Sequence, residues 1–474
     1  MLTSFKPGAQ RKTGASPKRL ARVTREVAQA LSQSKKGITD VVVSMVPQGV
    51  SLASGFFTSI LVARGLGPVG LGQYALVLSV SDVATTLSDL GIGQTAIRYA
   101  SRAARLGDSE TQFAVLRWTF QRRMSLLVLI GLVAFLAAPF VAGRIWHVPQ
   151  LTSLIRLGLL IGVFGAFAHV PSLYFQSLRR FHVNSAVLTA QALISLSGIL
   201  VLASLRRWSV GSVVVVSIVT AGVGAFVFLL LVPKTVLVSG RRRQPPPAAP
   251  PRARWGNPIT ANSEPQDAAV LESPDVFAFY MLLSSVLVIL IMKADVWLLG
   301  YFLDMRSVGL YNAGARLSLP LATLLAAINT ALWPRASSLV RIEDKIALLR
   351  KTIRLCSLVA LAGLGYAIVA PLLAPFLFGA RYARSVFLGQ LLCIRYLLAL
   401  LACPVGVVGY TLGFVRIYWL VNLLQLLIVL GLNVVLLPMI GPVGSALALI
   451  ANDAVGLVCI GMLIRWKLAQ QKEP

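Results

Sequence analysis

Several charged side chains interrupt otherwise apolar stretches of this sequence, and these are the places where chemistry could occur. Asp82 and Asp89 share one apolar run, with Thr85 and Thr86 between them. Positions i, i+3, i+4 and i+7 lie on one face of a helix, so the spacing predicts a polar stripe along that face. The stripe could bind a cation or a proton, or it could be a helix contact in which hydroxyl groups satisfy the carboxylates.

A second group of charges lies further along the chain. Lys293 and Asp295 are two residues apart and point to different faces of a helix, so each needs a partner elsewhere. We expect Asp295 to pair with Arg316. Arg395 lies deep in an apolar run, where it requires either an anionic ligand or a carboxylate such as Asp453.

The elements that position these residues are transmembrane helices. The chain has 474 residues, of which 57% are hydrophobic and 13% charged, with a mean hydropathy of +0.79. This composition is that of a membrane protein. Twelve apolar stretches are each about 20 residues long or more, enough to cross roughly 30 Å of hydrocarbon. They lie near residues 41–62, 71–97, 124–142, 151–178, 186–204, 209–232, 277–300, 309–333, 353–378, 386–413, 417–437 and 442–465.

The distribution of basic residues predicts how the chain is oriented. With a cytoplasmic amino terminus, 33 of the 44 Lys and Arg residues fall on the cytoplasmic side and 8 on the outer side, as the positive-inside rule requires. This explains the net charge of +28 without nucleic acid. Both termini are then cytoplasmic. The four cysteines lie in apolar runs without metal-ligand spacing, so neither a metal site nor a cofactor is expected.

Composition also divides the chain into segments. The expected segments are a basic disordered tail (1–40), a six-helix lobe (41–233), a Pro/Arg-rich cytoplasmic linker (234–274), a second six-helix lobe (275–466) and a short tail (467–474).

The two lobes carry the same landmarks in the same order. Gly72-Gln73-Tyr74 returns 237 residues later as Gly309-Leu310-Tyr311, and Val210-Gly211-Ser212 returns 233 residues later as Val443-Gly444-Ser445. A nearly constant offset indicates an internal duplication. Because each lobe has an even number of spans, both enter the membrane in the same direction, and the repeat is predicted to be parallel.

Several tracts resemble the polysaccharide (lipid-linked oligosaccharide) flippases of the superfamily that also contains multidrug and toxin extrusion pumps and lipid II flippases. They are RGLGPVGLGQYA, TTLSDLGIGQTAIRYAS, YFQSLRRF, DVWLLGYFLDMRSVGLYNAGARLSLP, APFLFGARY and NVVLLPMIGPVGSALA. The resemblance covers about residues 38–466. Residues at positions where the family has the same types are Arg64, Asp89, Gly91, Arg98, Asp295 and Tyr311. The linker is longer than usual in the family, and the absence of a thirteenth and fourteenth span tells against a lipid II flippase.

The resemblance implies alternating access between two lobes that moves an undecaprenyl-pyrophosphate-linked oligosaccharide to the outer leaflet of the inner membrane. Expected partners are this glycan lipid, membrane lipid, and the polymerase and glycosyltransferases of surface polysaccharide or lipopolysaccharide synthesis. Candidate substrate-binding residues are Arg395, Arg316, Lys293, Asp295, Asp82 and Asp89. Candidate coupling-ion residues are Asp82, Asp89 and Asp453.

The sequence leaves alternatives to this function. A multidrug or small-cation exporter of the same fold would depend chiefly on the coupling-ion carboxylates and tolerate a neutral residue at Arg395. Arg316 could also extend to the outer membrane surface instead of binding a ligand. An enzyme such as a glycosyltransferase would need a large outer loop with clustered catalytic groups, which the predicted topology lacks.

The predicted orientation is testable by cysteine labelling. In a variant whose native cysteines have been removed, Ala249→Cys should react with a membrane-impermeant thiol reagent only after the cells are permeabilised. Labelling in intact cells would show that residue 249 lies on the outer side and that the predicted orientation is wrong.

Overall fold

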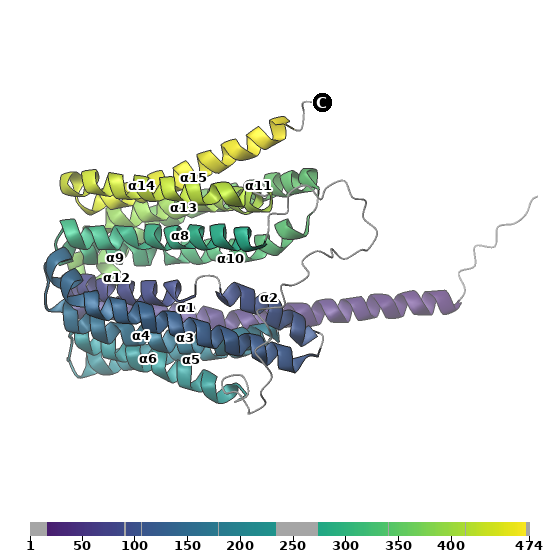
Figure 1. Cartoon of the computed structure of the whole chain (residues 1–474), viewed down its shortest axis with the longest axis horizontal. Helices are drawn as coiled ribbons and strands as arrows, with labels where there is room; N and C mark the ends of the chain where they lie inside the picture. Colours follow the sequence, from purple (N-terminus) through teal and green to yellow (C-terminus); the bar gives the residue numbers. More distant parts are fainter. Residues whose placement is uncertain are drawn as a thin grey trace, which may run out of the picture.

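The protein is built of helices that pack as two layers. The computed structural model describes residues 17–89, 92–105, 107–178, 180–233, 274–339, 341–412 and 414–470, and these contain helices and turns but no strand. Figure 1 shows helices α1 to α6 in one layer and α8 to α15 in the other, running along a common direction. The predicted all-α class is confirmed.

The first half, residues 17–233, contains six α-helices. They are α1 (Pro17–Leu87), α2 (Ile92–Arg105), α3 (Ser109–Phe140), α4 (Leu151–Ser177), α5 (Phe181–Ser204) and α6 (Val210–Leu231), with a π-turn, Val141–Ile145, after α3. Gly67 interrupts α1 with a non-helical φ of 67° and ψ of 178°. Such a positive φ suits glycine, which has no Cβ. α1 therefore consists of two arms, which correspond to the first two predicted spans.

The amino-terminal end of α1 differs from the prediction. The tail 1–40 was expected to be unstructured, but α1 begins at Pro17. Proline is favoured in the first turn of a helix, and residues 18–36 contain no glycine or further proline but many good helix formers such as Ala, Leu, Arg and Gln. Residues 1–16 lie outside the described part of the chain.

The second half, residues 274–470, contains eight α-helices. They are α8 (Pro274–Phe302), α9 (Met305–Leu317), α10 (Leu319–Ser338), α11 (Ile342–Leu372), α12 (Ala374–Phe378), α13 (Ser385–Thr411), α14 (Val415–Ile440) and α15 (Pro442–Gln470). The predicted span 309–333 is not one straight helix, because α9 and α10 meet at a bend of 53°. Pro320, in the first turn of α10, lacks the N–H needed to continue the α9 ladder. The predicted linker 234–274 falls almost wholly outside the described residues.

The described helices are long and apolar enough for a multi-pass membrane protein. Ten of them satisfy length and hydropathy on their own, and the bent α9–α10 pair makes up to eleven. That count takes 49–87 as one span of 39 residues. The break at Gly67 divides it into two arms, each about 30 Å long, which agrees with about twelve spans.

The tightest backbone contact between the two halves joins two glycines that the repeat makes equivalent. A Cβ on Gly72 would lie 2.1 Å from the carbonyl oxygen of Met305, and a Cβ on Gly309 would lie 1.8 Å from that of Pro68. The repeat offset of 237 residues separates Pro68 from Met305, and the same offset separates Gly72 from Gly309. The contact is therefore reciprocal, as between related surfaces across a two-fold axis, and it supports the predicted parallel repeat.

The hydrophobic core is distributed unevenly along the helices. Near the glycine contact, one cluster crosses between the halves and includes Leu71 and Leu76 with Leu299 and Val308. At the other end, each half has its own cluster. One gathers α2 to α6 side chains such as Leu116, and the other gathers second-half side chains such as those of Ile346, Val408 and Ile464.

Gly309→Ala should therefore weaken the association of the halves. Since the new methyl group would overlap the Pro68 carbonyl, we expect destabilisation of about 1–3 kcal/mol, measured by thermal unfolding in detergent. Gly431→Ala is the matched control, because a Cβ there meets nothing within 4 Å and alanine favours helix by about 1 kcal/mol. Equal unfolding temperatures for the two variants would contradict the importance of this contact.

Candidate functional site

Polar contacts between the halves begin at the break in α1. The Arg64 guanidinium donates from Nε to the Leu377 carbonyl and from an Nη to the Phe376 carbonyl, both at 2.6 Å. These carbonyls belong to the last turn of α12, where helix geometry leaves them without partners. The Tyr382 hydroxyl donates to the Ala63 carbonyl at 2.8 Å. Arg64 thus caps a helix of the opposite half.

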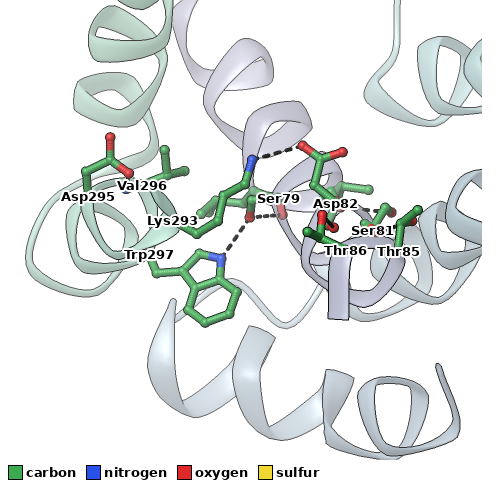
Figure 2. A network of polar contacts seen from close by, with 11 residues as sticks. Ser79, Ser81, Asp82, Thr85, Thr86, Lys293, Asp295, Val296 and Trp297 are labelled. Atoms are coloured by element: carbon green, nitrogen blue, oxygen red, sulfur yellow. Dashed lines mark hydrogen bonds and ion pairs between the residues drawn. The ribbon is translucent and has the colours of Figure 1, made fainter. Parts of the chain in front are cut away.

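The contacts continue about three and four turns along the second arm of α1. Trp297 donates from Nε1 to the Ser79 hydroxyl at 2.9 Å, and the Lys293 ammonium pairs with the Asp82 carboxylate at 2.9 Å. Figure 2 shows both side chains of α8 reaching towards α1. The Trp146 indole also donates to the carbonyl of Trp297 at 3.3 Å.

We call these contacts the seam. It comprises residues 62–82 and 146 of the first half with residues 293–311 and 376–382 of the second. The hydrogen bonds and the ion pair given above join the halves through this one region. The seam coincides with the apolar cluster that crosses between the halves, so the halves are joined at one end of the bundle.

Asp295 does not pair with Arg316, so that prediction is wrong. Asp295 points away from α1 (Figure 2) and accepts from the Tyr311 hydroxyl at 2.8 Å and the Val296 N–H at 2.7 Å. Tyr311 and Arg316 are five residues apart on α9, which places them roughly 140° apart around the helix. The phenol therefore faces α8 while the guanidinium does not.

Arg316 lies half-buried at the end of α9, just before the bend. Its charge interacts with the phenol groups of Tyr74 and Tyr382, one from each half. No carboxylate of the described residues lies within ion-pair distance of it. Arg316 thus places a cation beside a tyrosine of each half, without a carboxylate partner in the described part of the chain.

Arg395 has a protein partner. Its Nε lies 3.1 Å from the Asp453 carboxylate, and both side chains are 13% exposed. The other Asp453 oxygen accepts from the Asn452 side chain at 2.8 Å, and the guanidinium lies over the Tyr396 ring at 5.1 Å. Of the two roles that the sequence left open, the structural ion pair is the one observed.

The residues of the predicted stripe from Asp82 to Asp89 also do not lie on one face of a helix. α1 ends at Leu87, and the next helix starts at Ile92, so Asp89 leaves the helix that carries Asp82. Thr85 turns towards α4, where a Cβ on Gly162 would lie 2.8 Å from its hydroxyl, whereas Asp82 faces α8. Gly91 lies outside the described residues, and so does the side chain of Arg98.

Asp89 instead takes part in a cluster with the buried Arg123 of α3 and the half-buried His169 of α4. One Arg123 Nη donates to Asp89 Oδ1 at 2.6 Å and to His169 Nδ1 at 2.7 Å. Asp89 also caps α2 by accepting from the Gly93 N–H at 3.1 Å. We name this set of four residues the Asp89 cluster.

The role of Arg123 was not predicted, because the residue counted as a loop cation in the topology. The signal was the spacing of Leu116, Thr119, Arg123 and Leu127, all buried on one face of α3. This pattern of i, i+3, i+7 and i+11 marks an inward-facing position, where an arginine needs a carboxylate.

The ion pairs differ in how readily they can release a cation to a ligand. Exposed pairs such as Lys293–Asp82, with side chains 28% and 59% exposed, are worth about 0–1 kcal/mol. Breaking a buried pair such as Arg395–Asp453 leaves an uncompensated charge and costs about 3–5 kcal/mol. Of the predicted substrate-binding cations, Arg316 and Lys293 are therefore the two that lack a buried ion pair in the described residues.

Matched substitutions separate the two kinds of pair. Asp453→Asn strands the buried Arg395 charge and should destabilise the protein by about 3–5 kcal/mol in detergent unfolding. Asp82→Asn, the same change in an exposed pair, should cost about 1 kcal/mol or less. Arg395→Met combined with Asp453→Leu should recover most of the loss. Equal effects of the two single changes would refute a structural role for the Arg395 pair.

Comparison with known proteins shows which solved structures have a similar fold. No curated protein matches the sequence, but several solved structures share the fold. An inward-facing multidrug resistance MATE transporter of the MOP superfamily matches with a TM-score of 0.68 and 11% identity, covering 91% of this chain and 100% of that chain. The lipid II flippase MurJ in an inward closed conformation matches with a TM-score of 0.65 and 12% identity, covering 90% and 87%. A mutant of the MATE transporter VcmN from Vibrio cholerae matches with a TM-score of 0.58 and 14% identity, covering 90% and 96%.

A family model extends the match to the sequence itself. The model described as "Polysaccharide biosynthesis protein" matches residues 38–340, which includes the whole first half from residue 38 onwards and the seam residues of α8 and α9. The chain belongs to this polysaccharide biosynthesis protein family.

Proposed function

We propose that the protein is a flippase that moves a polyprenyl-pyrophosphate-linked oligosaccharide from the cytoplasmic to the outer leaflet of the inner membrane. Membership of the polysaccharide biosynthesis family supports the class of cargo. Undecaprenol as the lipid carrier follows from the family resemblance of the sequence. The protein makes and breaks no covalent bond in this process.

The observation that carries the proposal is the one-ended association of the halves. Their shared core lies at the seam together with the polar contacts that join them, whereas separate cores fill the halves at the opposite end. Two bodies held at one end can rock about their contact and expose the space between them to alternate sides. By the charge distribution, the seam is the outer end, so this structure is the state that admits a ligand from the cytoplasm.

Binding of the headgroup is assigned to Arg316 and Lys293. A pyrophosphate leaving water needs cationic donors in place of its hydration shell, and Arg316 has no counter-charge among the described residues. Lys293 can exchange Asp82 for a phosphate oxygen at little cost because the pair is exposed. This exchange would also remove one seam contact, which couples headgroup binding to separation of the halves at the outer end.

A drug or cation exporter is less well supported. Its predicted carboxylates are already neutralised, since Asp82, Asp89 and Asp453 each pair with a basic residue. Arg316, which has no carboxylate partner among the described residues, favours an anionic cargo.

Complementation tests the function and the headgroup site together. In cells whose own flippase is deleted, the protein should restore surface polysaccharide. Arg316→Ala should reduce it at least tenfold at normal protein level, and Arg316→Lys should recover part, because lysine supplies charge without the bidentate fork.

Arg384→Ala is the control, since it removes a cation from an exposed turn outside the seam. Full activity of Arg316→Ala would eliminate this headgroup site. Restoration of drug resistance without surface polysaccharide would refute the flippase assignment.

A further inference from the structure

The Asp89 cluster is a partly buried ionic group that the proposed headgroup site does not use. Arg123 is 3% exposed, and its Nε is buried without a hydrogen-bond partner. Asp89 contributes one negative charge and Arg123 one positive charge, so a neutral His169 leaves the cluster uncharged. Two features of the cluster leave room for a second arrangement: the unsatisfied Nε of Arg123 and its hydrogen bond to His169.

The hydrogen bond to His169 fixes its tautomer. A guanidinium can only donate, so His169 Nδ1 must accept and the proton of the neutral ring must lie on Nε2. The lone pair at Nδ1 is the site where a further proton would bind. In this structure an Nη of Arg123 donates to that lone pair, with 2.7 Å between Nη and His169 Nδ1.

We propose that His169 Nδ1 is the binding site of a coupling proton, and that its protonation displaces Arg123. The proton adds from water to the Nδ1 lone pair, forming an N–H bond and an imidazolium. Two donors cannot share a hydrogen bond, so the Arg123 contact with His169 breaks. Arg123 then turns further towards Asp89, whose second oxygen can accept the unsatisfied Nε.

Geometry allows the imidazolium to share the same carboxylate. A Cβ built on Gly93 would lie 2.9 Å from both Asp89 Oδ1 and His169 Cε1, so these two atoms are no more than twice that distance apart. Among the described side chains, Arg123 and Asp89 are the charged groups that act on the ring. α6 has no ionisable residue, and His182 of α5 is exposed.

The position of the cluster relates proton binding to transport. Asp89 caps α2 at the junction with α1, and Asp82, seven residues earlier on α1, pairs across the seam with Lys293. A change in the Asp89 contacts at the end of α1 can therefore act on the seam through one helix arm. This coupling role rests on the proposed flippase function, whereas proton binding itself does not.

Direct titration tests proton binding without transport. The chain has three histidines, so ¹⁵N-histidine-labelled full-length protein in detergent gives three pairs of ring nitrogen signals, and His169→Gln assigns one pair. We expect His169 Nδ1 to be unprotonated at pH 8 and to gain a proton as the pH is lowered to 4. A His169 ring that stays neutral at pH 4, or that carries its proton on Nδ1 at pH 8, would overturn the site.

Hydrogen exchange tests the displacement of Arg123. At pH 4, the amide of Gly93 should exchange at least threefold faster in the wild type than in His169→Gln, whose side-chain carbonyl can still accept from Arg123, and the two should agree at pH 8. No difference at pH 4 would contradict competition of Arg123 and the imidazolium with the Gly93 N–H for the Asp89 carboxylate.

Complementation then separates coupling from binding. His169→Gln should accumulate but lose most surface polysaccharide, whereas His182→Gln should retain it. If the ring titrates but His169→Gln complements fully, the proton does not drive transport. If the wild type itself fails to complement, the flippase proposal fails, while the NMR titration still decides the proton site.

Discussion

The backbone contact between Gly72 and Gly309 is the constraint on which the rest of the structure depends. Each glycine lies against a carbonyl of the opposite half, and no other residue type has so little volume there. This approach brings α1 and α9 together, allows Arg64 to reach the end of α12, and aligns Trp297 with Ser79. The contact is reciprocal, since each glycine meets a carbonyl that lies four residues before the other glycine.

The electrostatics follow from the low polarity of the surroundings. A charge buried away from water must have a counter-charge, or it destabilises the fold by several kcal/mol. Arg395 and Arg123 obey this rule through Asp453 and Asp89. Arg316 departs from it within the described part of the chain. A departure of this kind is expected at a functional site, where a ligand supplies the missing charge.

These features assign different roles to the two ends of the molecule. The seam is rich in directional contacts, and its Lys293–Asp82 ion pair can be broken at low cost because it is exposed. The opposite end keeps a separate core in each half, so its separation exposes no shared core. The Asp89 cluster lies where the second arm of α1 ends, between these regions. With the proposed headgroup and proton sites, ligand and proton would act on the same helix from different positions.

The sequence by itself determined that the protein is an all-α, multi-pass membrane protein, and it predicted an internal repeat. These depend on hydropathy, chain length and residue spacing, which are local properties. It also determined that Lys293 and Asp295 face apart, since helical periodicity requires it. Only the tertiary structure decided the ion-pair partners: Arg395 has Asp453, Asp295 has a tyrosine, and Arg123 has Asp89. A charge requires a counter-charge, but which one lies within hydrogen-bonding distance depends on how distant helices pack, and residue spacing along the chain does not encode that.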